Sequence, residues 1–291
     1  MFLVTGATGG IGRRVVRLLR QREQSVRAFV RLTSRYSELE HRGAEIFIGD
    51  LLHEKDIQKA TQGVKYIISA HGSDSDALSL DYRANIELID QAKANGVDHF
   101  VFISVLGADR GYEDAPVFKA KRAVERYLEA SGLNYTILRP SGLASNLLPL
   151  VERFRETGLY LLIGDRKNRT SIVSTDDLAR IVVDSVTVAG ARNQILPVGG
   201  PEILLREDIP RIFGRIFVKE PVIINSPLFL IDGLQGALGL FNPQIQKALG
   251  TYRTLLANEF FCTKDEIANL EAIFNFQLET LDNFLRRYLA V

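Results

Sequence analysis

The N-terminal part of the chain contains a glycine-rich turn between an apolar run and an amphipathic segment. Met1–Thr5 has the length and character of a buried strand, and residues 11–22 have the periodicity of a helix. Gly6, Gly9 and Gly12 stand between and within these two segments, each three positions from the next. Glycines at this point permit a tight turn and a close approach of helix to strand, so the pattern predicts the first βα unit of a parallel sheet.

Strand-like and helical patterns alternate after this unit. Strands are predicted at 26–30, 45–48, 66–70, 100–104 and 135–138, and helices at 54–61, 81–95 and 118–131. Short connections of this kind predict an α/β protein with a doubly wound parallel sheet and helices on both faces. We expect a Rossmann core over residues 1–145 and a smaller C-terminal substrate or partner lobe over 146–291, with 171–198 contributing strands back to the core.

The glycine turn also predicts a ligand. The amides and dipole at a helix N-terminus attract a pyrophosphate, and glycines let the backbone approach it closely. The residues expected at the phosphates of a nicotinamide dinucleotide are those of the turn: Gly6, Thr8, Gly9, Gly10, Ile11 and Gly12. The alternative is a tight turn that binds nothing.

Two arginines indicate which dinucleotide is bound. Arg31 ends the second strand, where an acidic residue would hold the ribose hydroxyls of NAD. A guanidinium instead matches the 2′-phosphate of NADP, and Arg13 directly after the last glycine is expected to join it. We therefore expect NADP(H), with NAD(H) the less suited cofactor. Alternatively, Arg31 and Arg35 are ordinary solvated charges.

Further cofactor contacts are expected at the carboxyl ends of the strands, where open α/β sheets bind ligands. Asp50 and Leu51 follow the third strand and are expected to meet the adenine. The dinucleotide cleft is also expected to be lined by Ser69, Ala70, His71 and Gly72, at the end of the fourth strand. The alternative for Asp50 is a carboxylate that caps a helix.

The charge balance and the rare residues exclude several classes of function. Lys and Arg number 36 against 35 Asp and Glu, so no basic surface indicates nucleic acid. Cys262 is the single cysteine, and the four histidines are scattered, so no metal site is expected. The chain enters its first strand at once and leaves no room for a targeting peptide, which predicts a cytoplasmic protein.

The later segments resemble the NmrA-like atypical short-chain dehydrogenase/reductases. The resemblance is carried by Thr5–Gly9, Phe100–Val105, Lys121–Glu125, Asn134–Gly142 and Leu196–Glu202. It spans about residues 1–210 and is greatest to cyanobacterial and plastid members, some of which serve photosystem assembly. A member of that kind would be stromal or peripheral to a membrane.

This resemblance implies roles for individual residues. Pro140, Ser141 and Gly142 match positions near the nicotinamide, and Lys121 matches the family lysine that bonds the nicotinamide ribose hydroxyls. Ser104 and Lys121 are the candidate catalytic residues. The alternative for Ser104 is a hydroxyl bonded to backbone, and for Lys121 it is a surface ion pair with Glu125.

The chain departs from active classical members at the proton donor. Those members carry Tyr-x-x-x-Lys, and here Val117 stands four residues before Lys121. Valine cannot donate a proton, and Tyr112 would need an unusual loop path to replace the missing tyrosine. We therefore expect a cofactor-dependent scaffold, sensor or assembly factor. The alternatives are an NADPH-dependent reductase of a small carbonyl or enone that uses Lys121, and a structural subunit stabilised by bound cofactor.

Residues 221–246 form an apolar stretch in which Asp232 is the one charged residue. Proline and glycines interrupt it, so it is not expected to span a membrane. It predicts a buried helix or a surface for a protein partner. Peripheral membrane association is a further reading, weakened because the stretch has no Lys or Arg for lipid headgroups.

Farther on, Thr263–Glu266 has the pattern of a capping box and predicts a helix start.

Overall fold

The computed structural model describes residues 1–72, 76–112, 115–229 and 243–290, without the side chains of 243–249. The chain divides into two compact units. The first consists of Met1–Arg139 and Thr175–Leu196, and the second of Pro140–Ser174 and Pro197–Val291.

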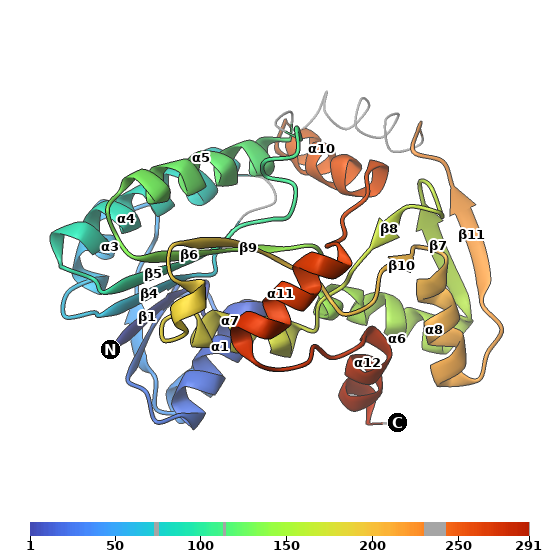
Figure 1. Ribbon diagram of the computed structural model, residues 1–291, viewed down its shortest axis with the longest axis horizontal. Helices are drawn as coiled ribbons and strands as arrows, with labels where there is room; N and C mark the ends of the chain where they lie inside the picture. The colour runs from blue at the N-terminus through green and yellow to red at the C-terminus, as the bar shows by residue number, and fades with distance from the viewer. Residues whose placement is uncertain (73–75, 113–114, 230–242, 291) are drawn as a thin grey trace. The chain divides into compact units, whose positions relative to one another are not determined.

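The first unit is built on a seven-stranded sheet of order β3-β2-β1-β4-β5-β6-β9 (Figure 1). The strands are β1 (Phe2–Thr5), β2 (Val26–Val30), β3 (Glu45–Ile48), β4 (Tyr66–Ser69), β5 (His99–Ile103), β6 (Tyr135–Pro140) and β9 (Gln194–Val198). The pairings from β3 through to β6 are parallel. The chain reverses its direction of travel across the sheet between β1 and β4, which is where such sheets bind ligands. The predicted doubly wound Rossmann fold is confirmed.

Helices cover both faces of this sheet. They are α1 (Gly10–Gln21), α2 (Ser37–His41), α3 (Glu54–Ala60), the π-helix η1 (Ala77–Arg83), α4 (Ala84–Ala94), α5 (Pro116–Ala130), α7 (Thr175–Asp184) and the short 3₁₀ turn η3 (Ala189–Ala191). α3, α4 and α5 lie on one face, and α1 and α7 lie together on the other (Figure 1). The fully buried side chains of Leu3, Ile67 and Phe100 represent the core between these layers. Their strands are apolar except at one end residue each, because both faces are covered.

The second unit contains two small sheets and several helices. Strand β7 (Leu159–Ile163) pairs with β11 (Val222–Ser226) in parallel, and β8 (Arg169–Thr170) pairs with β10 (Leu204–Leu205) antiparallel. The helices are η2 (Ala144–Leu147), α6 (Leu148–Thr157), α8 (Asp208–Phe217), α10 (Pro243–Ala257), α11 (Lys264–Phe274) and α12 (Leu281–Leu289). Phe154, Phe213 and Phe284 are fully buried in its core.

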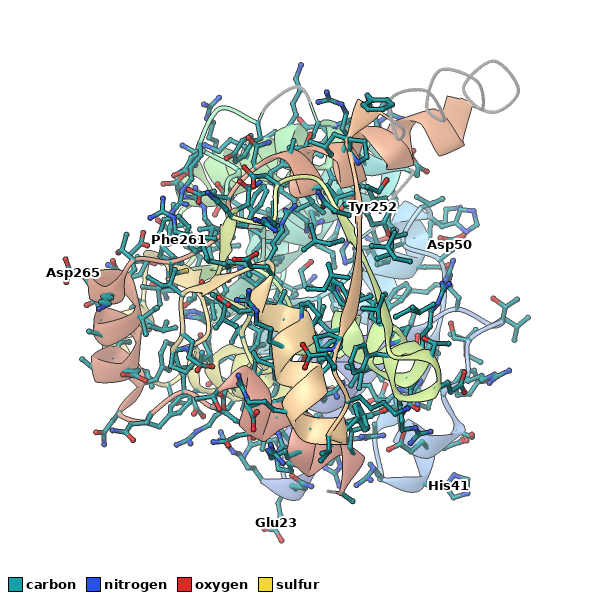
Figure 2. The ribbon with its side chains drawn as sticks, turned by 90° about the vertical axis from the view of Figure 1, so that its right-hand side faces the viewer. Glu23, His41, Asp50, Tyr252, Phe261 and Asp265 are labelled. Carbon is teal, nitrogen blue, oxygen red and sulfur yellow. The ribbon has the colours of Figure 1, made fainter. Side chains whose placement is uncertain are left out.

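The predicted capping box is confirmed at the start of α11. The Thr263 hydroxyl accepts a hydrogen bond from the Glu266 amide at 3.2 Å, and the Glu266 carboxylate accepts one from the Thr263 amide at 2.7 Å. Asp265, in the same first turn, points away from the ribbon (Figure 2). Such reciprocal bonds satisfy helix amides that have no intrahelical acceptor.

Much of the apolar stretch 221–246 lies outside the described residues. Its described beginning is β11, whose Val222, Ile223 and Ile224 are all exposed. Among the helices that the structure describes, none combines the length and apolar character needed to cross a membrane.

Candidate functional site

The glycine turn has a backbone path that other residues could not follow. Gly6 has φ +65°, and a Cβ on it would lie 2.6 Å from the Ala70 carbonyl oxygen. A Cβ on Gly12 would lie 2.2 Å from the Gly6 carbonyl oxygen, which is far inside van der Waals contact. Gly9 is the N-cap of α1 and donates its amide to Gly6 at 2.9 Å. The turn therefore brings the N-terminus of α1 close to the ends of β1 and β4, as a phosphate site requires.

A cavity of about 500 Å³ opens at this turn, entirely within the first unit. Its volume is in the range of pockets that hold cofactors. The lining residues come from the ends of β1, β2, β3 and β4 and from η1: Gly6, Thr8, Gly9, Phe29, Val30, Arg31, Ser34, Asp50, Leu51, Leu52, Ala70, His71, Gly72, Asp76 and Leu80. The structure thus brings together residues of the glycine turn with Arg31, Asp50, Leu51 and Ala70.

The two arginines predicted at the 2′-phosphate have different surroundings. Arg31 lines the cavity, and among the described residues its guanidinium has no hydrogen-bond or ion-pair partner. The Arg13 guanidinium instead binds Glu38 at 3.0 Å and the backbone oxygens of Thr8 and Arg35. Arg13 is therefore held at α2, outside the set of residues that line the cavity.

Glu38 on α2 is the acceptor that holds this group of arginines. Its carboxylate accepts hydrogen bonds from Arg17 at 2.6 Å, from Arg42 at 2.9 Å and from Arg13. The hydrogen bonds from Arg17 and then from Arg42 and Arg13 lower the pKa of Glu38 to about 2. α2 was not predicted from the sequence, and this carboxylate was missed with it.

Asp50, which Figure 2 labels, follows the end of β3 by two residues. It lines the cavity together with Leu51. Its carboxylate accepts a hydrogen bond from the Leu52 amide at 3.0 Å, and its own amide donates to Asp56 at 2.9 Å. The N-cap of α3 is His53, so Asp50 holds the preceding turn and does not cap the helix. The role of Asp50 at the adenine stays a prediction.

His71 follows β4 and is buried against the cavity. Its Nδ1 lies 2.8 Å from the Thr5 hydroxyl and its Nε2 lies 3.1 Å from the Leu80 carbonyl oxygen. A carbonyl can only accept, so Nε2 carries the proton and the Thr5 hydroxyl donates to Nδ1. Ser69, by contrast, donates its hydroxyl to Asn85 at 2.6 Å and is absent from the cavity lining. Of the residues expected to line the cleft at the end of β4, Ala70, His71 and Gly72 line this cavity.

We expect the stability of the fold to fall between pH 6.5 and 5. Burial, and then the charge of Lys121, lower the pKa of His71 to about 3, and burial lowers that of His99 to about 4. The unfolded chain then binds protons that the folded chain does not, so this stability is complete above pH 6.5 and is lost as the pH falls. The loss is about 2 kcal/mol for each histidine at pH 5.

Urea unfolding at pH 7 and pH 5 measures this effect. The variant His71→Gln should lose about half of the pH dependence, whatever its stability at pH 7. The variant His53→Gln, at an exposed position, should keep all of it. A pH dependence unchanged in His71→Gln would contradict the assignment.

Ser104 directly follows β5 and belongs to a buried ionic network. Its hydroxyl donates to the Glu125 carboxylate at 2.6 Å. Glu125, which is fully buried on α5, also accepts two hydrogen bonds from Arg139, at 2.9 and 2.7 Å, and one from Arg122 at 2.9 Å. Arg139 pairs in addition with Asp109. The Ser104 hydroxyl is thus bonded to a carboxylate and not to backbone, and the network was not foreseen.

Lys121 is buried on α5, and the alternative of a surface pair with Glu125 is wrong. Its ammonium donates to the Ile103 carbonyl oxygen at 3.0 Å, lies 3.6 Å from Asp81 and stands over the Phe102 ring at 5.2 Å. The partners of Glu125 are Arg139, Arg122 and Ser104, as described above. Lys121 thus stands at the carboxyl end of β5, and its role at the nicotinamide ribose stays a prediction.

The position of the missing tyrosine is one helical turn before Lys121. Val117 occupies it, in the first turn of α5. The Tyr112 ring packs edge-on against Phe118, with 5.8 Å between the ring centres. Tyr112 precedes α5, and the structure supplies no phenol at the helical position of Val117.

Pro140, Ser141 and Gly142 stand at the end of β6, in the second unit. Ser141 donates its amide to Val198 at 3.0 Å and its hydroxyl to the Ser171 carbonyl oxygen. The Gly142 carbonyl oxygen accepts a hydrogen bond from Val173 at 2.9 Å. The Ser141 hydroxyl therefore holds the backbone together, and the placement of these three residues near a nicotinamide stays a prediction.

Comparison with known proteins identifies the family. The model of the NAD(P)H-binding family matches residues 6–188, which include every residue of the cavity. The chain belongs to the NAD(P)H-binding family. The resemblance to NmrA-like proteins and the expected class of cofactor are thereby confirmed.

Relatives match over most of their length. The photosystem II assembly factor Ycf39 of Cyanophora paradoxa is 26% identical over 98% of this chain and 91% of its own. The Ycf39 of Guillardia theta is 28% identical over 98% of this chain and 93% of its own. The NAD(P)H azoreductase of Xenophilus azovorans is 33% identical over 70% of this chain and 69% of its own.

Solved structures share the fold of the whole chain. The NADPH-dependent quinone oxidoreductase QOR2 of Escherichia coli, complexed with NADPH, has a TM-score of 0.81 at 19% identity and covers 99% of this chain and 100% of its own. The triphenylmethane reductase of Citrobacter sp., complexed with NADP(H), has a TM-score of 0.78 at 20% identity, with coverage of 98% and 99%. At such identities the likeness establishes the fold alone.

Proposed function

We propose that this protein is an NADP(H)-binding assembly factor that uses the bound cofactor to set an interaction, without turnover. The proposal is carried by the glycine turn and its cavity being present while Val117 occupies the position of the usual proton donor on α5. The match to Ycf39 proteins over 98% of the chain supports the assembly role. In such a role, the cofactor would bind the first unit and stabilise it by mass action.

The surroundings of Ser104 favour binding over chemistry. A serine that orients a substrate carbonyl must donate its proton to that carbonyl. The Ser104 hydroxyl already donates to Glu125, an acceptor-only carboxylate that is fully buried. To donate to a substrate, Ser104 would have to give up this charge-assisted bond.

A second candidate function is an NADPH-dependent reductase of a small carbonyl or enone. Lys121 favours it, because a buried ammonium is a proton source in the first unit. The azoreductase of Xenophilus azovorans, at 33% identity, is a relative named for catalysis. In this reading Lys121 is the catalytic residue.

One experiment separates the two functions. NADPH oxidation is followed against a panel of carbonyls, enones, quinones and azo dyes, for the wild-type chain and for Lys121→Met. The proposal expects NADPH to bind with no turnover by either protein, and a partner to co-purify only when NADPH is present. Turnover that disappears in Lys121→Met would overturn the proposal in favour of the reductase.

The same proposal extends to the surface that would bind a partner protein and to the cellular compartment of this protein. A protein partner is proposed to dock through the stretch 221–246, whose described beginning is the exposed apolar strand β11. The names of several relatives include the word chloroplastic, which supports a stromal protein at the periphery of a membrane.

We expect Arg31 to determine the preference for NADP(H) over NAD(H). Its guanidinium lines the cavity and has no anionic partner within the described part of the chain. In Arg31→Ala, the Kd for NADPH should rise by roughly 10- to 100-fold, because a charge-assisted bond to phosphate is lost. Titration calorimetry with NADPH and NADH measures both constants.

The control for this prediction is NADH, which has no 2′-phosphate. Its Kd should change less than about threefold in Arg31→Ala. The variant Arg13→Ala should affect NADPH less than Arg31→Ala does, because Arg13 is bonded to Glu38. Equal losses for NADPH and NADH would show that Arg31 does not read the phosphate.

A further inference from the structure

Asp81 and Lys121 form a buried ion pair that neither the sequence pattern nor the family match assigns. The carboxylate of Asp81 is fully buried, and its Oδ1 lies 3.6 Å from Lys121 Nζ. Phe102 and the Ile103 carbonyl oxygen contact the same ammonium from the end of β5. Opposite charge, ring face and carbonyl all attract an ammonium, so together they fix its position.

An irregular helix carries Asp81 to this point. η1 is a π-helix of seven residues, and single turns of this kind often occur at functional sites. Leu80 lines the cavity and its carbonyl oxygen accepts from His71, while the next residue, Asp81, reaches Lys121. The Asp81 carbonyl oxygen is in turn bonded by Asn85 at 2.8 Å. η1 thus contacts the cavity and α5 with successive residues.

Gly72 is a residue of the cavity lining that lies close to this ion pair. It lines the cavity, and a Cβ built on it would lie 3.2 Å from Asp81 Oδ1 and 4.0 Å from Lys121 Nζ. Any side chain at position 72 would therefore stand against the pair. With glycine there, a ligand atom that took the place of this Cβ would lie about 4.0 Å from the Lys121 ammonium.

We infer that Asp81 is a positioning residue, which holds the Lys121 ammonium at the Gly72 side of the cavity to bind the hydroxyl groups of the nicotinamide riboside. The inference rests on the cofactor binding in the proposed function and adds to it a residue from η1. The ligand is the half of NADPH that carries vicinal hydroxyls, to which an ammonium donates. Asp81 itself acts through Lys121.

The test compares NADPH with 2′,5′-ADP, a fragment that lacks the nicotinamide riboside. In Asp81→Asn, the Kd for NADPH should rise roughly tenfold, while the Kd for 2′,5′-ADP should stay within about twofold. Calorimetric titration measures both. A merely structural role would weaken both ligands alike, and that result, or an unchanged Kd for NADPH, would overturn the inference.

Further variants secure the result. Lys121→Met should give the same selective loss, and the double variant should lose no more than either single one, because both changes remove one interaction. If Asp81→Asn does not fold, Gly72→Ala tests the same access and should also weaken NADPH selectively. Asp90→Asn, on the exposed side of α4, is the matched control and should bind both ligands as the wild type does.

The outcomes also separate the inference from the proposed function. A wild-type chain that binds neither NADPH nor 2′,5′-ADP would overturn both. Tight binding of NADPH by the wild type and by Asp81→Asn would overturn the inference and leave the proposed function standing.

Discussion

The variant Gly12→Ala is expected to lose dinucleotide binding. A Cβ at this position would lie 2.2 Å from the Gly6 carbonyl oxygen and 2.7 Å from its carbon, both backbone atoms that cannot turn aside. The turn or α1 must then move, and the amides that bind the pyrophosphate move with it. We expect the Kd for NADPH to rise at least about 100-fold, measured by calorimetry or by NADPH fluorescence.

A graded series makes this expectation specific. Gly9→Ala places its Cβ 3.2 Å from the same Gly6 oxygen, a contact that a shift of a few tenths of an ångström relieves. Its loss of affinity should therefore be smaller than that of Gly12→Ala. Circular dichroism establishes that both variants are folded. Binding by Gly12→Ala at wild-type affinity would contradict the assignment of the turn as the pyrophosphate site.

The sheet and the turn were predictable because their signals are local. Parallel strands covered on both faces have nearly continuous apolar sequences, and β1, β4 and β5 each have one, with a polar residue only at one end. The glycines of the turn are required by backbone geometry, which residue spacing displays directly. The cavity residues Arg31 and Asp50 were found by the same logic, because each follows the end of a strand.

The partners of the site residues were not predictable, because they come from distant positions. Arg13 was expected at a phosphate, but the structure gives it Glu38, which is 25 residues away on a helix of one turn. A five-residue helix has too few positions for a periodic pattern. The π-helix η1 escaped for a related reason, since a helix was expected only from residue 81 and a π-turn has no sequence signature of its own.

The ionic network around Glu125 is a feature that the sequence pattern did not predict. The sequence offered Glu125, one turn after Lys121, only as the partner of Lys121 in an alternative surface ion pair. In the structure Glu125 is fully buried. Its carboxylate accepts hydrogen bonds from Ser104, just after β5, and from Arg139 on β6. A buried carboxylate must have its charge paired, so its burial and its partners were determined together by the tertiary fold.

Replacing Glu125 with alanine is expected to be the most destabilising single change in the first unit. The Arg139 side chain is 8% exposed and donates two of its hydrogen bonds to the Glu125 carboxylate. Without that carboxylate a buried guanidinium keeps only Asp109, and the Ser104 hydroxyl loses its acceptor. Breaking a buried pair by removing one partner costs about 3–5 kcal/mol, so we expect a loss of this size in the free energy of unfolding.

Urea unfolding of Glu125→Ala and Glu129→Ala provides the measurement and its control. Glu129 is on the same helix, one turn later, and lies 3.8 Å from Arg122, but its side chain is 37% exposed. Exposed pairs contribute at most about 1 kcal/mol, so Glu129→Ala should unfold close to the wild type. The double variant Glu125→Ala with Arg139→Met should recover part of the loss, because it removes the unpaired charge as well. Equal stabilities of the two single variants would contradict the network, and Ser104 would then be able to donate its proton to a substrate.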